Sequence, residues 1–224
     1  MKNIWVIANW KSNKNISEAI SWVDTVGPQI PGKEALKVVV CPTAICVEEV
    51  KKAVLVGGYH LVVGSQDLSS FDEGAYTGEE AARILKDIVD LSILGHSERR
   101  QNFKETDETV AQKVNQARQF NIEPLVCVQD ENTPVPSGVK LVAYEPIFAI
   151  GTGTPDTPQN ADNIAKLLKQ KHGEELEVLY GGSVTSENAK AFLSMENISG
   201  LLIGKASLEP AEFIKIIEIA DSLI

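Results

Sequence analysis

Eight short apolar segments recur along the chain and alternate with longer stretches of helical spacing. Most are rich in β-branched residues and apolar throughout, which is typical of parallel strands covered on both faces. The expected strands are Ile4–Ala8, Leu36–Cys41, Leu61–Gly64, Leu91–Gly95, Pro124–Val128, Lys140–Tyr144, Glu177–Tyr180 and Leu201–Gly204. This alternation predicts an α/β fold built on a parallel sheet.

Helical spacing fills most of the intervals between these segments. At Thr157-Pro158 a capping residue precedes proline at the first helical position, and the hydroxyls of Ser183 and Ser186 are candidate caps for the next helix. The expected helices are Ile16–Val26, Ala44–Val54, Glu79–Val89, Asp107–Phe120, Pro158–His172, Ser186–Leu193 and Pro210–Ser222.

No linker or low-complexity tract interrupts residues 1–224, so a single domain is expected. Eight strands favour a compact, closed (β/α)8 barrel, although periodicity alone does not exclude an open sheet. The interval between Val128 and Lys140 has two prolines and no apolar stripe. We therefore expect the fifth helix to be missing or reduced to a turn.

Composition limits the functional classes. The formal net charge of −10 and the lack of any Lys/Arg run argue against nucleic acid or an anionic membrane as partners. Three cysteines without Cys-x-x-Cys or zinc-finger spacing predict reduced, buried thiols and no metal site. Because no segment has about 18 consecutive apolar residues, we expect a cytoplasmic protein.

Polar residues follow three of the expected strands directly. They are Asn9 and Lys11 after the first strand, His96 and Glu98 after the fourth, and Glu145 after the sixth. Each alone has a structural explanation, such as a surface ion pair for Lys11 or a helix-start contact for His96. Barrel strands bring their carboxyl ends to one rim, so the set together predicts an acid–base site there.

Glycine-bearing loops follow three strands and suit an anionic ligand. One contains Gly151, one contains Ser183, and one contains Gly204 and Lys205. Backbone N–H groups in such loops approach anions closely, so a phosphorylated substrate is compatible with the overall negative charge.

The connection Ser69–Gly78 is longer than an ordinary strand-to-helix loop and carries two aromatic residues. Large apolar side chains on a protruding loop predict burial against another chain.

Taken in order, these motifs resemble the triosephosphate isomerase family over essentially the whole chain. They are Asn9-Trp-Lys11, Phe71-Asp-Glu-Gly-Ala-Tyr-Thr-Gly-Glu79, Gly95-His-Ser-Glu-Arg-Arg100, Ala143-Tyr-Glu-Pro146, Ala149-Ile-Gly-Thr-Gly153 and Tyr180-Gly-Gly-Ser-Val184. The resemblance implies an isomerase of glycolysis and gluconeogenesis that interconverts dihydroxyacetone phosphate and glyceraldehyde 3-phosphate. It also implies that no metal or organic cofactor is needed.

By matching position, the resemblance implies that Glu145 removes the substrate carbon proton and that His96 moves protons between the two oxygens. Lys11 would stabilise the enediolate charge. Glu98 would pair with Lys11, and Asn9 would be its polar neighbour. For Glu98 and Asn9, a structural role is as compatible with the sequence as a chemical one.

The same resemblance implies that backbone N–H groups of Gly151, Ser183, Gly204 and Lys205 bind the substrate phosphate, beneath a lid from Pro146 to Asp156. The family usually has glycine where this chain has Lys205. If that backbone needs a positive φ, lysine adds about 1 to 2 kcal/mol of strain.

A homodimer is also implied, in which Thr77 of one chain approaches Asn9, Lys11 and Glu98 of the other. A tetramer is an alternative assembly, because the shortened fifth unit resembles compact members of the family. Two other functions stay open: a catalytically impaired barrel that binds phosphate metabolites or acts as a scaffold, and a barrel enzyme for a related phosphorylated sugar or amino sugar.

Overall fold

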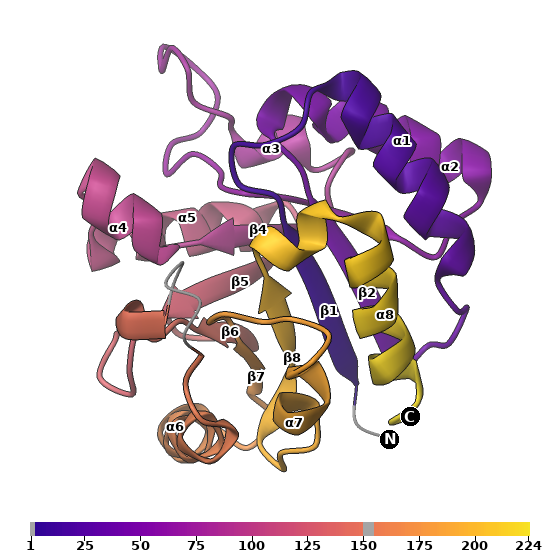
Figure 1. Ribbon diagram of the computed structural model, residues 1–224. Coiled ribbons are helices and arrows are strands. Elements are labelled where there is room, and N and C mark those ends of the chain that lie inside the picture. The colour runs from indigo at the N-terminus through magenta and orange to yellow at the C-terminus, as the bar shows by residue number, and fades with distance from the viewer. Residues whose placement is uncertain (1–2, 150–154) are drawn as a thin grey trace.

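The computed structural model describes residues 3–149 and 155–224. Eight parallel strands form a closed barrel in sequence order, because β8 pairs with β1 (Figure 1). The strands are β1 Ile4–Asn9, β2 Leu36–Cys41, β3 Val62–Ser65, β4 Leu91–Leu94, β5 Glu123–Val128, β6 Leu141–Tyr144, β7 Glu177–Tyr180 and β8 Ile198–Ile203. The structure therefore confirms the eight strands and selects the closed barrel over the open sheet.

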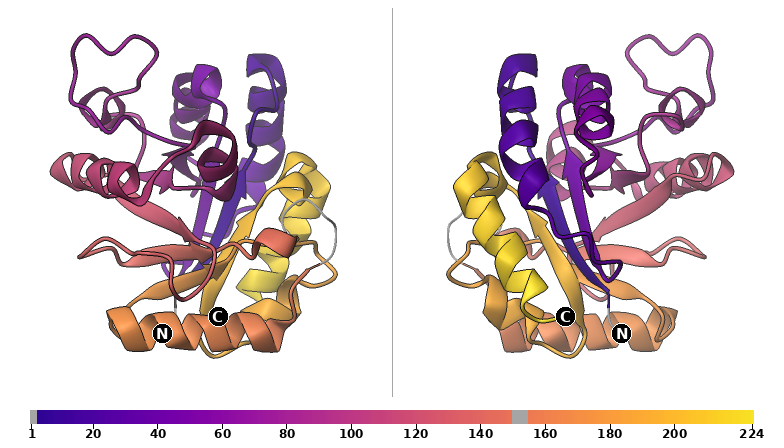
Figure 2. Two further views of the ribbon diagram at one scale, coloured as in Figure 1. Left: turned by 90° about the vertical axis from the view of Figure 1, so that its left-hand side faces the viewer. Right: turned by 90° about the vertical axis from the view of Figure 1, so that its right-hand side faces the viewer.

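Helices surround the barrel on its outside (Figures 1 and 2). The α-helices are α1 Ile16–Val26, α2 Val47–Gly57, α3 Ala82–Leu85, α4 Ser97–Phe103, α5 Asp107–Gln119, α6 Pro158–His172, α7 Ala189–Leu193 and α8 Pro210–Asp221. The 3-10 helices are η1 Gly27–Gln29, η2 Ala44–Cys46, η3 Ile147–Ala149 and η4 Lys205–Leu208. None of the described helices is both long and apolar enough to span a bilayer.

Two layers of side chains make the core. One cluster contains buried residues of seven strands, including Ile7, Leu91 and Leu125, together with the thiols of Cys41 and Cys127. The larger cluster joins the other faces of the strands to the helices. All three cysteines are free and buried, as the sequence predicts.

The barrel closes tightly at the seam between β1 and β8. A Cβ atom on Gly200 would collide with the carbonyl oxygen of Trp5. Trp5 and Gly200 are paired residues of these two strands, so a side chain at this position would force them apart.

No helix lies between β5 and β6, which confirms the reduced fifth unit. Instead, the hydroxyl of Thr133 accepts the N–H groups of Gln129 and Asp130, and Oδ1 of Asp130 accepts those of Asn132 and Thr133. These side-chain bonds stabilise a compact turn in place of a crossover helix.

Two predicted helices are too long. The helix predicted over Glu79–Val89 is confined to α3, because the carbonyl of Glu80 accepts the N–H of Ser69 at the base of the long loop. The helix predicted over Ser186–Leu193 is confined to α7.

The expected hydroxyl cap of α7 is also wrong. Asn188 is the N-cap, and its side chain accepts the N–H of Thr185 in the preceding turn, while the N–H of Ser186 donates to Glu212. At α6 the prediction is confirmed, since Thr157 caps the helix and Pro158 is its first residue.

Candidate active site

The side chains singled out from the sequence lie at the carboxyl ends of the strands. Asn9 is the last residue of β1, and Lys11 follows it by two positions. His96 lies between β4 and α4, and Glu145 directly follows β6. In the part of the chain that the structure describes, the closed topology therefore brings these side chains to one rim.

His96 is the N-cap of α4, and its Nδ1 atom accepts the N–H of Glu98 at 3.2 Å. A ring nitrogen that accepts a hydrogen bond carries no proton, so the other nitrogen, Nε2, carries it in the neutral ring. The imidazole is also largely buried, with 6% of its surface exposed. The geometry thus favours a neutral imidazole that donates from Nε2.

Glu145 lies beside that nitrogen. Its Oε1 atom lies 3.1 Å from Nε2 of His96, and its Oε2 atom accepts the N–H of Ser97 at 2.9 Å. The side chain is 1% exposed. A carboxylate in this setting is held by neutral donors, and it is available to accept a proton from a ligand.

The thiol of Cys127 on β5 contacts this carboxylate from inside the barrel. Burial and then the charge of Glu145 raise the pKa of Cys127 well above its ordinary value, so the thiol stays protonated. It is therefore a donor to Glu145 and not a nucleophile. From the sequence, Cys127 is expected only to be one of three buried thiols.

Lys11 has a left-handed backbone, with φ of 53°. The side chain of Asn9 accepts its N–H at 3.1 Å, and the side chain of Gln66 donates to its carbonyl at 2.8 Å. Backbone strain at such a residue amounts to about 1 to 3 kcal/mol, and these contacts offset it. Gln66 was not predicted, because its role is a contact to backbone that no motif encodes.

The ammonium group of Lys11 lies 2.5 Å from Oε1 of Glu98, the pairing expected from the sequence. Both side chains are partly exposed, so this pair contributes little to stability. The pair instead orients the side chain of Lys11, because it fixes the position of the ammonium group at the rim.

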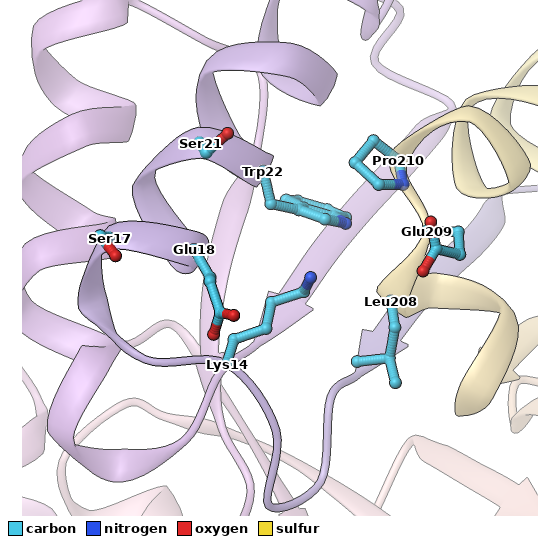
Figure 3. Close-up of a pocket in the computed structure, with 8 residues that line it drawn as sticks. All are labelled: Lys14, Ser17, Glu18, Ser21, Trp22, Leu208, Glu209 and Pro210. Atoms are coloured by element: carbon cyan, nitrogen blue, oxygen red, sulfur yellow. The ribbon is translucent and has the colours of Figure 1, made fainter.

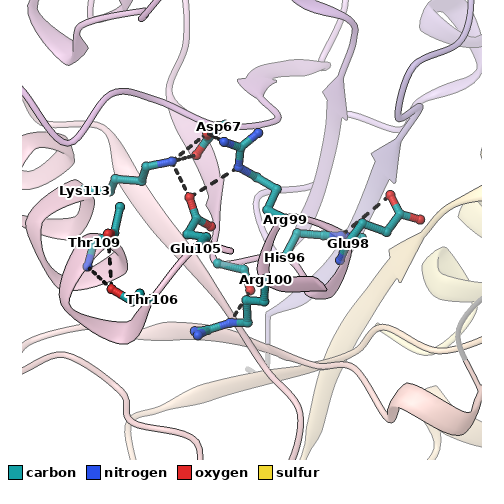
Figure 4. Close-up of polar contacts among 10 residues, drawn as sticks. Asp67, His96, Glu98, Arg99, Arg100, Glu105, Thr106, Thr109 and Lys113 are labelled. Atoms are coloured by element: carbon teal, nitrogen blue, oxygen red, sulfur yellow. Dashed lines mark hydrogen bonds and ion pairs between the residues drawn. The ribbon is translucent and has the colours of Figure 1, made fainter. Parts of the chain in front are cut away.

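A partly buried ionic network joins α4 to α5 (Figure 4). Arg99 on α4 bonds to Asp67 and Glu105, and Lys113 on α5 bonds to the same two carboxylates. The side chains of Lys113 and Glu105 are only 4% and 3% exposed. Burial raises the pKa of Asp67 although both cations oppose the shift. The network ties the segment that carries His96 and Glu98 to the adjacent strand end and helix.

The expected phosphate-binding residues are placed in part. Ser183 follows β7, and Gly204 faces the ammonium group of Lys11, since a Cβ atom there would lie 3.9 Å from Nζ. Lys205 begins η4 and is not among the residues of positive φ, so the strain considered for this position is absent. Gly151 lies outside the described residues, as do residues 150–154 of the expected lid.

Thr77 lies in the long loop after β3, which projects from the barrel (Figure 2). All residues from 71 to 80 are exposed, and the rings of Phe71 and Tyr76 stack at 4.3 Å between centroids. These rings are 46% and 44% exposed. Large aromatic side chains in such positions mark an interaction surface.

A separate hollow of about 450 Å³ lies between the start of α1 and the start of α8 (Figure 3). Lys14, Glu18 and Trp22 line one side, and Leu208, Glu209 and Pro210 line the other. It contains neither Glu145 nor His96, so it is distinct from the site at the rim.

Among the described residues, no group of three or more His, Cys, Asp or Glu side chains is arranged to hold a metal ion.

A closed (β/α)8 barrel with a carboxylate, an imidazole and an ammonium group at one rim defines a barrel enzyme of the acid–base type. A family model described as triosephosphate isomerase matches residues 4–220. The chain belongs to the triosephosphate isomerase family.

Curated relatives agree over almost the full length. Proteins named triosephosphate isomerase from Alkaliphilus oremlandii and Clostridium beijerinckii are 38% and 36% identical to this chain. One from Mesomycoplasma hyopneumoniae is 35% identical. Each alignment covers 97% of this chain and 99% of the relative. The alignments span 243 to 250 positions against 224 residues here, so part of each relative has no counterpart in this chain.

Proposed function

We propose that this chain interconverts dihydroxyacetone phosphate and D-glyceraldehyde 3-phosphate by proton abstraction through an enediolate intermediate. Within a member of this family, the contact of 3.1 Å between His96 and Glu145 carries the proposal. It places a proton acceptor beside a proton donor, and this reaction requires both.

Glu145 is the proposed base that takes a proton from one substrate carbon and returns it to the neighbouring carbon. His96 donates its Nε2 proton to the carbonyl oxygen, which becomes a hydroxyl, and Nε2 then takes back the proton of the other hydroxyl, which becomes a carbonyl. These roles follow the known mechanism of the family. The bond from the N–H of Glu98 to Nδ1 supports them, because it keeps the donor proton on Nε2.

Lys11 is the proposed electrostatic stabiliser of the enediolate. Its ammonium group is oriented by Glu98, while Asn9 supports its backbone. An oriented positive charge stabilises developing negative charge more than mobile water does, because it needs no reorganisation during the reaction.

The phosphate group would bind to the backbone N–H groups of Ser183, Gly204 and Lys205, and to that of Gly151 outside the described residues. Hydrogen bonds to a charged group contribute about 1.5 to 3 kcal/mol each. Three such bonds would contribute on the order of 5 to 9 kcal/mol before the costs of binding. The nearby ammonium group of Lys11 supports an anion in this place.

Neither a metal ion nor an organic cofactor is part of the proposed reaction. The substrate exchanges protons between carbon and oxygen without net oxidation, and the chain supplies base, acid and cation. We further propose that residues 1–224 act as one domain and that the enzyme works in the cytoplasm, in glycolysis and gluconeogenesis.

The proposed assembly is a homodimer, with a tetramer as the alternative. In it, Thr77 of one chain would approach Asn9, Lys11 and Glu98 of the other. The exposed stack of Phe71 and Tyr76 beside Thr77 supports this assembly, since a partner would bury it.

A coupled assay of glyceraldehyde 3-phosphate isomerisation tests the function. The wild type should be active, whereas Glu145→Gln should be nearly inactive because it keeps the shape but lacks the basicity. A wild type that binds phosphate compounds without turnover would instead indicate a binding or scaffold protein. Larger phosphorylated sugars should be poor substrates.

A further inference from the structure

Asp156 is a buried acidic residue that the proposed roles do not use. It lies directly before Thr157, the N-cap of α6, and is 8% exposed. Burying a carboxylate is unfavourable unless its oxygens are hydrogen-bonded, so the partners of this side chain identify what it does.

The carboxylate of Asp156 has three donors. Its Oδ2 atom accepts the hydroxyl of Tyr144 at 3.1 Å and the side-chain amide of Asn160 at 2.7 Å. Its Oδ1 atom accepts the N–H of Thr157 at 2.7 Å. The side chain therefore joins the end of β6 to the first turn of α6.

The main chain of Asp156 reaches the neighbouring strand. Its N–H donates to the hydroxyl of Tyr180 at 2.8 Å. Tyr144 and Tyr180 are paired residues at the ends of β6 and β7, and the ring of Tyr180 stacks on Phe192 at 3.8 Å. Burial raises the pKa of both phenols, that of Tyr180 to about 12, so both stay protonated near neutral pH.

These two tyrosines directly precede the site. Tyr144 is followed by Glu145, and Tyr180 is followed by Gly181, whose N–H donates to the carbonyl of Tyr144 at 2.8 Å. A Cβ atom on Gly181 would lie 3.0 Å from Cγ of Glu145. A shift of either tyrosine is therefore transmitted to the base through main-chain and packing contacts.

We propose that Asp156 is a positioning residue for the isomerisation, acting through Tyr144 on Glu145. The inference rests on the proposed function. Without the carboxylate, the hydroxyl of Tyr144 loses its acceptor, and the end of β6 is no longer joined to α6. The base then samples positions away from the substrate carbon, and misplacement of about 1 Å lowers turnover strongly.

Because the side chain and the main chain of Asp156 contact different strands, removing the side chain should affect kcat and KM differently. Asp156→Ala removes the bonds to Tyr144 and Asn160 but keeps the N–H that donates to Tyr180. The loop after β7, with Ser183, should therefore stay in place. We expect kcat to fall about 10- to 100-fold while KM changes less than about threefold.

Asp162, which lies on α6 itself, offers a matched control. Its carboxylate accepts the N–H and the side-chain amide of Asn197 at 2.7 and 3.1 Å, away from the rim. Asp162→Ala should lower the melting temperature in the same way as Asp156→Ala but leave kcat within about twofold of the wild type.

Two further variants keep the test decisive if Asp156→Ala does not fold. Asp156→Asn retains one acceptor oxygen and should recover a large part of kcat. Tyr144→Phe removes the donor and should lower kcat as Asp156→Ala does. The double variant should then be no worse than about twofold below Asp156→Ala, because both changes break one contact.

Equal kcat values for folded Asp156→Ala and Asp162→Ala would overturn the inference, as would fully additive losses in the double variant. If Asp156→Ala does not fold, unchanged kcat in Tyr144→Phe would overturn it. A wild type without isomerase activity would overturn the proposed function and this inference together. If the wild type is active but Asp156→Ala and Asp162→Ala have equal kcat values, only the inference is overturned.

Discussion

Nε2 of His96 lies 3.1 Å from Oε1 of Glu145, and the two side chains come from the ends of different strands. The other ring nitrogen accepts a backbone N–H, so the contact joins a neutral donor to a carboxylate. Donor and acceptor therefore lie side by side at the rim of the barrel.

Glu145→Gln should lower kcat about 1000-fold, within the range that general-base catalysis contributes. The amide oxygen can still accept the N–H of Ser97, so the fold should be preserved. Steady-state kinetics and circular dichroism of the same preparation check both parts. Retention of more than about a tenth of wild-type kcat would contradict the assignment of Glu145 as the base.

Lys113→Met should be strongly destabilising, because it leaves the carboxylates of Asp67 and Glu105 buried with Arg99 as their remaining cation. Breaking a buried ionic group in this way costs about 3 to 5 kcal/mol. For a chain of this size the melting temperature should fall by about 6 to 20 °C. Lys52→Met, at an exposed pair with Glu48 and Glu49, is the control and should leave the melting temperature nearly unchanged.

Some of the polar contacts of the site could be predicted from the sequence, and others could not. The pairing of Lys11 with Glu98 was expected from the resemblance to the family, and the barrel brings together the strand ends that these residues follow. The contacts of Gln66 and Asp156 were not, because each is a bond to one particular carbonyl or hydroxyl that local patterns do not specify. Only the closed barrel brings those partners together.

The same distinction explains the helix boundaries. The starts of α1 and α6 match the prediction because local N-caps define them, at Asn15 and Thr157. The start of α3 does not, because the carbonyl of Glu80 bonds to Ser69 across the long loop. A tertiary contact there overrides helical spacing that extends back to Glu79.

Stability in mild acid should depend on Glu212. The N–H of Ser186 bonds to this carboxylate at 2.7 Å and lowers its pKa below 4.5 in the folded protein. A depressed pKa contributes stability that is present above pH 4.5 and is lost as the pH falls through the folded value. Between about pH 6 and 3, the melting temperature should fall less steeply with decreasing pH in Glu212→Gln than in the wild type. An identical slope in both proteins would contradict the assignment.

Lys205→Gly should change KM less than about tenfold, because the backbone donor at this position needs no positive φ. Lys205 lies in a helical turn that glycine can also adopt, and its side chain is exposed. Kinetics with glyceraldehyde 3-phosphate, beside inhibition by inorganic phosphate, check the prediction. A loss of affinity of about 100-fold for both ligands would show that the ammonium group itself binds the phosphate.

Replacing both aromatic residues of the long loop should weaken the proposed dimer without unfolding the barrel. In the isolated chain Phe71 and Tyr76 stack on each other and remain largely exposed, so serine at both positions should leave the melting temperature of the barrel little changed. In the proposed dimer, however, these rings would be buried against the partner, and their loss should favour the monomer. Sedimentation velocity should then show one species near the mass of 24.3 kDa, with activity lost because Thr77 of the partner no longer reaches Lys11 and Glu98. A monomer with full activity would mean that each barrel completes its own site.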